Sequence, residues 1–268
     1  MADLVFVKLG GSLITDKRTR ESARHDVIAR AAGEIARALR AAPNLRLLVG
    51  HGSGSYGHFA AQRYHVHTGR LEDWCGYAET GAAAQRLNRL VTDALLAEGV
   101  PAVSIQPSAS AQAHDGALAS LAVAPIRALL AHGAAPLIYG DVALDDVRGC
   151  TIISTEQIMA YLAPELAPRR ILMVGEVDGV YTADPQRDPT AELIPEISPE
   201  NYDHIASLLS SSFGVDVTGG MATKVHALYA LVTRHTGLTA RIIGGRAPGA
   251  IERALCDPDA PLGTLIRG

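Results

Sequence analysis

Short apolar runs alternate along this chain with longer, Ala-rich stretches of helical period, and this order limits the folds open to it. Apolar runs at 4–9, 46–50, 102–105, 136–139, 170–174 and 240–243 predict strands. Stretches at 26–41, 74–98, 122–132, 155–162 and 222–235 predict helices. Several strands are apolar on consecutive residues, which is typical of a sheet covered on both faces. The alternation predicts an α/β fold, a three-layer α/β/α sandwich with an open, mainly parallel sheet.

Composition narrows the class of protein. Apolar residues make up 48% of the 268 residues, enough for one large α/β domain or two small ones. The net charge of −4 and the lack of a Lys/Arg run argue against a nucleic-acid partner. Three scattered cysteines without a CxxC pair argue against a disulfide framework or a zinc cluster. The apolar run at 4–7 is too short for a signal peptide, and no run reaches about 18 residues. We therefore expect a cytoplasmic protein without a membrane partner.

Four glycine-rich turns follow or precede these elements: 10–12, 50–57, 219–220 and 244–245. Open α/β sheets bind ligands at the carboxyl ends of their strands, and exposed backbone N–H groups there suit phosphates. Any one of the turns is equally well explained as a tight turn. Several in one chain, two of them close to a lysine, favour a phosphate ligand. The proline-rich segment 180–199 is expected to be a long loop that covers the ligand.

The turn VGHGSGSYGHFA (49–60) is compatible with three kinds of site. It contains the dinucleotide pattern GxGxxG, but 59–73 offers no second strand to complete that unit. It also approaches the GxSxG elbow of serine hydrolases, with Ser55 as nucleophile and Ser53 in place of the leading glycine. The third interpretation, a phosphate-binding loop, agrees best with the lysines elsewhere in the chain.

Three lysines lie where a cation needs an explanation. Lys8 ends an apolar strand, which is costly unless its ammonium group has a partner or reaches solvent. Lys17 follows in the loop ITDKRTR and is a solvated loop charge by default. Lys224 opens a helix, where a cation opposes the helix dipole unless an anion is bound there. Together the three suggest a polyphosphate, because phosphoryl transfer depends mainly on positioning and on positive charge.

Five segments resemble motifs of the amino-acid kinase superfamily: VKLGGSLITDK (7–17), GHGSGSYGHFA (50–60), YGDV (139–142), VDGVYTADP (177–185) and DVTGGMATK (216–224). Their order and spacing resemble those of isopentenyl phosphate kinases in particular. The resemblance implies one domain over 1–268 with the amino-acid kinase fold, assembled as a homodimer. It implies an acceptor-binding half at about 1–165 and a half at about 166–268 that binds ATP with Mg²⁺.

The resemblance also implies roles for individual residues. Catalytic roles fall to Lys8, Lys17, His58 and Lys224. ATP contacts fall to Lys8, Gly10, Gly11, Ser12, Gly54, Asp178, Gly219 and Lys224. Acceptor contacts fall to Ser53, Gly54, Ser55, His58, Gly140, Asp141 and Thr155. Asp141 would also organise the lysines or the metal shell, and no metal-ligand cluster is visible in the sequence.

The implied activity is ATP-dependent phosphorylation of isopentenyl phosphate by direct in-line transfer. The chain departs from the family at Ser53, where a glycine is usual, and at 154–157, where STEQ replaces Ser-Gly-Asp-Asp. The second departure leaves other small acceptors open: an acetylated amino acid, a nucleoside monophosphate or a phosphonate. A non-catalytic nucleotide or oxyanion sensor and a Ser55 hydrolase are the alternatives from other classes.

Overall fold

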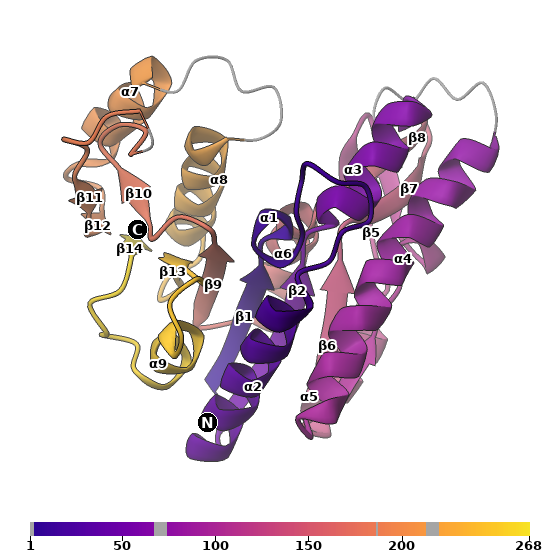
Figure 1. The fold of residues 1–268 in the computed structure, drawn as a ribbon, viewed down its shortest axis with the longest axis horizontal. Helices are drawn as coiled ribbons and strands as arrows, with labels where there is room; N and C mark the ends of the chain where they lie inside the picture. The colour runs from indigo at the N-terminus through magenta and orange to yellow at the C-terminus, as the bar shows by residue number, and fades with distance from the viewer. Residues whose placement is uncertain (1–2, 67–73, 186, 213–219) are drawn as a thin grey trace.

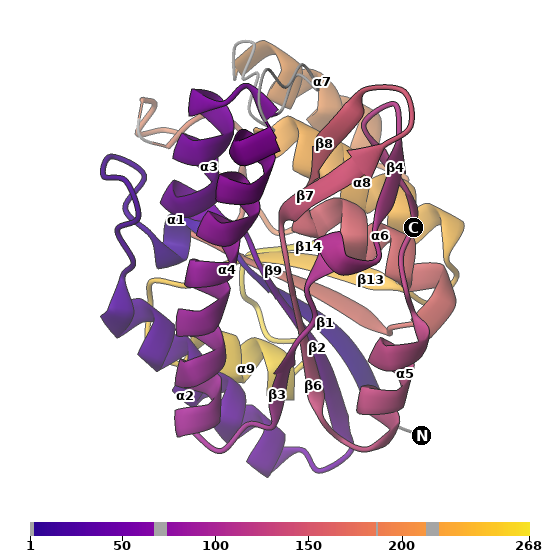
Figure 2. The same cartoon turned by 90° about the vertical axis from the view of Figure 1, so that its right-hand side faces the viewer.

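An eight-stranded sheet runs through the molecule in the computed structural model, which describes residues 3–66, 74–185, 187–212 and 220–268 (Figures 1 and 2). Its strands lie in the order β12-β14-β13-β9-β1-β2-β6-β3. They span β1 Asp3–Leu9, β2 Leu45–His51, β3 Ala102–Ser104, β6 Ala135–Tyr139, β9 Arg170–Gly175, β12 Glu196–Ile197, β13 Thr239–Gly244 and β14 Thr264–Arg267. Neighbouring strands are parallel except β13 and β14. The predicted open, mainly parallel sheet is confirmed.

Helices cover both faces of this sheet and enclose two cores (Figure 2). One face carries α1 Gly11–Ile14, α2 His25–Ala41, α3 Gly54–Arg63, α4 Trp74–Ala97 and α9 Ala250–Cys256. The other carries α5 Ala124–Ala131, α6 Thr155–Leu166, α7 Tyr202–Ser212 and α8 Met221–Arg234. The periodic stripe of α2 is buried as its sequence predicts, with Ile28 and Ile35 on the sheet side.

The alternation of side chains along β1 decides which core each residue enters. Val5, Val7 and Leu9 pack in the core under α2 and α4, whereas Phe6 packs in the core under α6 and α8. Lys8 shares the face of Phe6, because residues two apart on a strand point the same way. Its ammonium group is therefore directed toward the helices that begin at residues 155 and 221, not toward α2.

A second, four-stranded sheet stands over the carboxyl edge of the first, in the order β5-β4-β7-β8 (Figure 2). It is formed by β4 Gln112–His114, β5 Ala117–Ser120, β7 Asp141–Asp145 and β8 Gly149–Ile153, with the 3-10 turn η2 Pro107–Ala109 before β4. Gly140 is the one residue between the end of β6 and the start of β7. The chain therefore passes straight from the main sheet into the second one.

Each of the six predicted strands and five predicted helices is present, with ends shifted by a few residues. Helices α1, α3, α7 and α9, strand β14 and the second sheet were not predicted from the sequence. Helix α3 is rich in Gly and Ser, which are poor helix formers, so its existence depends on packing against α4. The segment 180–199, predicted to be a loop, instead contains β12 and the short pair β10 Val180–Tyr181 and β11 Leu193–Ile194.

Candidate active site

The first two glycine turns press against each other at the carboxyl edge of the sheet. They follow β1 and β2, which are adjacent parallel strands paired from Asp3–Leu45 to Leu9–His51. A Cβ added to Gly11 would lie 2.5 Å from the backbone nitrogen of Gly54, and one added to Gly52 would lie 2.8 Å from that of Gly11. No side chain fits between the two turns, so glycine is needed there for close approach as well as for flexibility.

The turn after β9 and the turn after β13 continue this edge. The amide of Gly10 donates to the carbonyl of Val174 at 2.8 Å, and that of Gly245 donates to Gly175 at 2.8 Å. Gly220 is the N-cap of α8, whereas the predicted Gly219 lies outside the described residues. The glycine turns near residues 10, 52 and 244 thus lie along one edge, where open α/β sheets bind ligands.

Lys8 has the partner that its burial demands. Its Nζ forms an ion pair and hydrogen bond with Glu156 Oε1 in the first turn of α6, and its side chain is only 8% exposed. Gly50, paired with Lys8 across β1 and β2, lets α6 come this close, since a Cβ there would lie 2.7 Å from Thr155 Cγ2. Ser154 and Gln157 begin the helix with a reciprocal capping box.

Glu156 is also influenced by Lys224, which lies at the start of α8. Burial opposes ionisation of Glu156, but the charge of Lys8, its hydrogen bond and the charge of Lys224 together lower the pKa of the carboxyl. Lys224 is half-buried in the first turn of α8, on the same face of the sheet as Lys8. Glu156 therefore pairs with one predicted lysine, Lys8, and is stabilised by the charge of a second, Lys224. From the sequence, Glu156 stood out only as a departure from the family pattern at 154–157.

Asp141 does not contact these lysines. Its Oδ2 accepts from the amide of Ser108 at 3.0 Å, and its Oδ1 accepts from the amide of Val142 at 2.9 Å. Burial raises the pKa of Asp141 in spite of these hydrogen bonds. Asp141 was predicted to organise the lysines or the metal shell; its described hydrogen bonds go to backbone amides and not to a lysine, and the role in the metal shell stays a prediction. A carboxylate directly after a strand stabilises the neighbouring turn η2 here, and Glu156 pairs with Lys8 instead.

Ser55 is committed to contacts within the protein. Its amide donates to Thr15 Oγ1 at 3.0 Å, and its hydroxyl oxygen accepts from the amide of Ser22 at 3.1 Å. Thr15 Oγ1 in turn donates to the carbonyl of Gly11 at 2.7 Å. The residue is 1% exposed, so Ser55 is not placed to attack a substrate, which removes the basis of the hydrolase alternative. Its amide is likewise not available as the phosphate donor that the resemblance implied.

Two histidines in the second glycine turn have opposite environments. His58 lies on the exposed side of α3 and makes no hydrogen bond or ion pair with any described residue. His51 is fully buried, and desolvation lowers its pKa to about 4. Its Nδ1 lies 3.1 Å from the carbonyl of Gly52, its Nε2 accepts from Asn88 at 3.1 Å, and its ring stacks on Tyr139. His51 is therefore a neutral support beneath the turn, and His58 is exposed where a ligand can reach it.

Gly140 and Thr155 also hold His51 in place beneath the second glycine turn. The amide of Gly140 and the hydroxyl of Thr155 both donate to the carbonyl of His51, at 3.3 Å and 2.6 Å.

Two other predicted site residues are exposed. Asp178 lies after β9, next to the end of β13. A Cβ added to Gly244 would lie 2.1 Å from Asp178 Oδ1. Lys17 is exposed in the loop between α1 and α2, and makes no described hydrogen bond or ion pair.

Comparison with known proteins identifies the family. The sequence model of the amino acid kinase family matches residues 3–244. This chain belongs to the amino acid kinase family. The match extends over both halves of the eight-stranded sheet, from β1 to the end of β13.

Relatives within the amino acid kinase family match nearly the whole chain. The isopentenyl phosphate kinase of Methanothermobacter thermautotrophicus is 39% identical over 99% of this chain and 97% of its own length. That of Haloferax volcanii is 37% identical over 93% of this chain and 98% of its own. A glutamate 5-kinase of Vibrio vulnificus is 32% identical, but over 52% of this chain and 35% of its own length.

Solved structures of amino acid kinases agree with the observed fold. An X-ray structure of an isopentenyl phosphate kinase superposes with a TM-score of 0.82 at 36% identity, over 98% of this chain and all of that one. An aspartate kinase from Synechocystis superposes with a TM-score of 0.67 at 16% identity, and shares the fold. Within the described residues, no helix is long and apolar enough to cross a membrane.

Proposed function

We propose that this protein transfers the γ-phosphoryl group of ATP to isopentenyl phosphate, giving isopentenyl diphosphate and ADP. The observation that carries the proposal is the 39% identity over 99% of the chain with an isopentenyl phosphate kinase. The geometry supports it, because Lys8 pairs with Glu156, whose pKa the charge of Lys224 also lowers, at the sheet edge that carries the closely packed glycine turns.

The proposed chemistry is an in-line displacement. An oxygen of the acceptor phosphate attacks the γ-phosphorus of ATP while the bond from that phosphorus to the β,γ-bridging oxygen breaks. The electron pair leaves with ADP. The acceptor is already an anion, so no strong general base is required. Lys8, Lys17 and Lys224 would neutralise charge that builds on the equatorial and leaving oxygens.

His58 and the second glycine turn are proposed to hold the acceptor. His58 extends from α3 without a described partner, so its imidazole can donate to the acceptor phosphate. Ser53 and Gly54, at the start of this helix, would add backbone N–H donors, aided by the positive end of the helix dipole. Gly140, Asp141 and Thr155 would act through the turns that they support. Ser55 would act in the same way, since its described polar contacts are all internal.

ATP is proposed to lie over the first glycine turn and the ATP-binding half. Gly10, Gly11 and Ser12 would face its phosphates, Asp178 would lie at the nucleotide, and Gly219 and Lys224 would hold the donor phosphates. Mg²⁺ would arrive on ATP, since it is usually held by substrate phosphates with one or two carboxylates. No group of three His, Cys, Asp or Glu in the described ranges forms a separate metal site.

Assembly and location follow from the same proposal. We infer a homodimer in the cytoplasm, because the resemblance to isopentenyl phosphate kinases implies a homodimer and the composition predicts no membrane partner. Gel filtration with light scattering would test the dimer directly. A monomer at micromolar concentration would contradict it.

A coupled assay of ADP release across several acceptors tests the activity. Isopentenyl phosphate should give kcat/KM at least about a hundredfold above glutamate or N-acetylglutamate, because these acceptors lack the phosphate and leave the polar groups of that site unpaired. It should exceed a nucleoside monophosphate or a phosphonate by at least about tenfold, the scale of discrimination by the fit of the rest of the acceptor. Glutamate is the second candidate, because glutamate 5-kinases match about half of this chain. A preference for glutamate, or ATP binding without turnover of any acceptor, would overturn the proposal.

A further inference from the structure

The loop that carries Lys17 is tied at its base into a closed turn. We define the Lys17 loop as residues 15–24, between α1 and α2. Thr15 and Ala23 form an antiparallel bridge, and the amide of Asp16 donates to the carbonyl of Ser22 at 2.9 Å. Lys17 itself stands exposed, without a described hydrogen bond or ion pair. The backbone of the loop therefore decides which region the ammonium group of Lys17 can reach.

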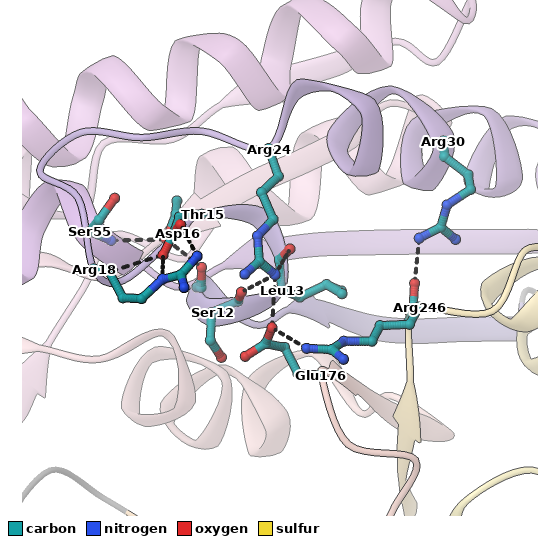
Figure 3. Close-up of polar contacts among 12 residues, drawn as sticks. Ser12, Leu13, Thr15, Asp16, Arg18, Arg24, Arg30, Ser55, Glu176 and Arg246 are labelled. Atoms are coloured by element: carbon teal, nitrogen blue, oxygen red, sulfur yellow. Dashed lines mark hydrogen bonds and ion pairs between the residues drawn. The ribbon is translucent and has the colours of Figure 1, made fainter.

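One end of the Lys17 loop is anchored by Arg24. Its Nη1 donates to Glu176 Oε1 at 2.8 Å and to the carbonyls of Ser12 and Leu13 at 3.0 and 3.4 Å (Figure 3). Those carbonyls belong to the last turn of α1, where helix carbonyls lack partners of their own. A single guanidinium thus joins the Lys17 loop, the helix after the first glycine turn, and the turn after β9.

Glu176 is held from two sides. It follows β9 directly, and its Oε1 also accepts from Arg246 at 2.9 Å, two residues beyond the end of β13 (Figure 3). Burial alone would raise the pKa of Glu176. The hydrogen bonds and charges of Arg24 and Arg246 outweigh this effect and lower the pKa below its usual value, so the carboxylate is charged at neutral pH. The contact joins residues 152 positions apart, one in each half of the chain.

The opposite side of the Lys17 loop is anchored to the acceptor-binding half. Glu21 forms two hydrogen bonds with Arg86 on α4, at 2.6 and 2.9 Å, and Ser22 donates to Ser55 on α3. The loop therefore contacts α3 and α4 on one side and, through Arg24 and Glu176, the end of β9 on the other. Arg246, just after β13, binds the same carboxylate. Arg24 and Glu176 form the described ion pair between the loop and the second of these sides.

We propose that Arg24 and Glu176 are positioning residues that hold the Lys17 loop against the ATP-binding half and so set kcat. The inference rests on the proposed kinase activity. A partly exposed ion pair contributes little to global stability, so its removal should act on the loop and not on the fold. A displacement of about 1 Å in a catalytic group can cost roughly a hundredfold in rate.

Steady-state kinetics with ATP and isopentenyl phosphate provide the first test. Arg24→Ala and Glu176→Ala should each lower kcat roughly tenfold or more, with both KM values within about twofold, because Lys17 acts on charge formed in the transition state. The double variant should lose less than the product of the two single losses, because the contact between Arg24 and Glu176 is already broken in either single variant. Arg24→Lys should be intermediate, since it keeps the charge but loses the guanidinium fork.

An ion pair on α2, the helix that follows the Lys17 loop, provides the matched control. Arg37 on α2 pairs with Glu252 on α9 at 2.6 Å, is also partly exposed, and makes no described contact with the Lys17 loop. Arg37→Ala should keep the wild-type kcat. Thermal unfolding should show all variants folded at the assay temperature, and Arg24→Lys serves if an alanine variant does not fold.

Limited trypsin digestion tests the loop without using kinase activity. Lys17, Arg18 and Arg20 are exposed cleavage sites within the loop. Loss of the anchor should increase the rate of cleavage there roughly fivefold or more, because native-state proteolysis follows the population of the opened segment. Arg37→Ala should be cut at the wild-type rate.

The two measurements separate the possible failures. Faster cleavage with unchanged kcat would overturn the inference, and so would lower kcat with unchanged cleavage. If the wild-type protein phosphorylates no acceptor, the proposed function fails. Digestion still judges the anchor in that case: unchanged cleavage in Arg24→Ala and Glu176→Ala would overturn it, and faster cleavage would support it.

Discussion

Lys8 on β1 and Glu156 on α6 form an ion pair across 148 positions of sequence, with the Lys8 side chain 8% exposed. Each residue supplies the opposite charge that the other needs at its position. An ammonium group on the buried face of a central strand requires a counter-charge, and a carboxylate at a buried helix start is favoured by both the helix dipole and the lysine. Lys224 adds a second positive charge to the same carboxylate.

This pairing should appear in stability separately from activity. Lys8→Met should lower the free energy of unfolding by about 1–3 kcal/mol, because it leaves the carboxylate without its cation. Adding Glu156→Gln should recover part of that loss, since the unpaired charge is then removed. Both variants should lack measurable turnover. Urea unfolding with the coupled assay checks this, and full activity in Lys8→Met would remove Lys8 from the site.

His58 is expected to matter for catalysis and hardly at all for folding. His58→Ala should lower kcat/KM for isopentenyl phosphate by roughly a hundredfold, as for other preorganised donors to a developing charge. Its exposed position and lack of described partners predict a change in unfolding free energy within about 0.5 kcal/mol. His132→Ala, an exposed histidine at the end of α5, is the matched control. Near-native kinetics in His58→Ala would rule out the proposed acceptor contact.

His51 should make the protein less stable in acid. Its pKa of about 4 in the folded state lies below the unfolded value of 6.5, so the unfolded chain binds the proton first as the pH falls. Stability from this group is complete above pH 6.5 and is lost as the pH falls toward 4, by about 3 kcal/mol in all. Urea unfolding at pH 7.5, 6 and 5 should show this slope. His51→Gln should flatten it, and an unchanged slope in that variant would contradict the assignment.

Gly54 should tolerate a side chain much less well than Gly133, another glycine with left-handed backbone. It has φ of +51°, and a Cβ there would lie 2.2 Å from Thr15 Oγ1. Gly133 has φ of +76° and open space around it, so Gly133→Ala measures the backbone strain alone, about 1–2 kcal/mol. Gly54→Ala should cost about 3 kcal/mol or more, because steric overlap is added to the strain. Equal losses in the two variants, measured by urea unfolding, would show that the two turns do not pack as described.

Local sequence patterns were enough to predict the layers and the kind of site. Apolar runs separated by periodic helices specified a parallel sheet covered on both faces, because burial of a strand or a helix face leaves a local pattern. The glycine turns and the three lysines indicated a phosphate site for a similarly local reason. Helix α3 and the second sheet left no such pattern, since short elements rich in Gly, Ser and Ala form only through packing.

Which charges meet depends on how distant segments pack. Asp141 and Glu156 look equally suited in sequence to organise lysines, yet one stabilises η2 and the other pairs with Lys8. Ser55 and His58 lie three residues apart, yet one is buried in internal hydrogen bonds and the other is exposed. The contact of Arg24 with Glu176 spans 152 positions. Such partners follow from strand register and helix placement, which bring distant residues together and which a local pattern does not encode.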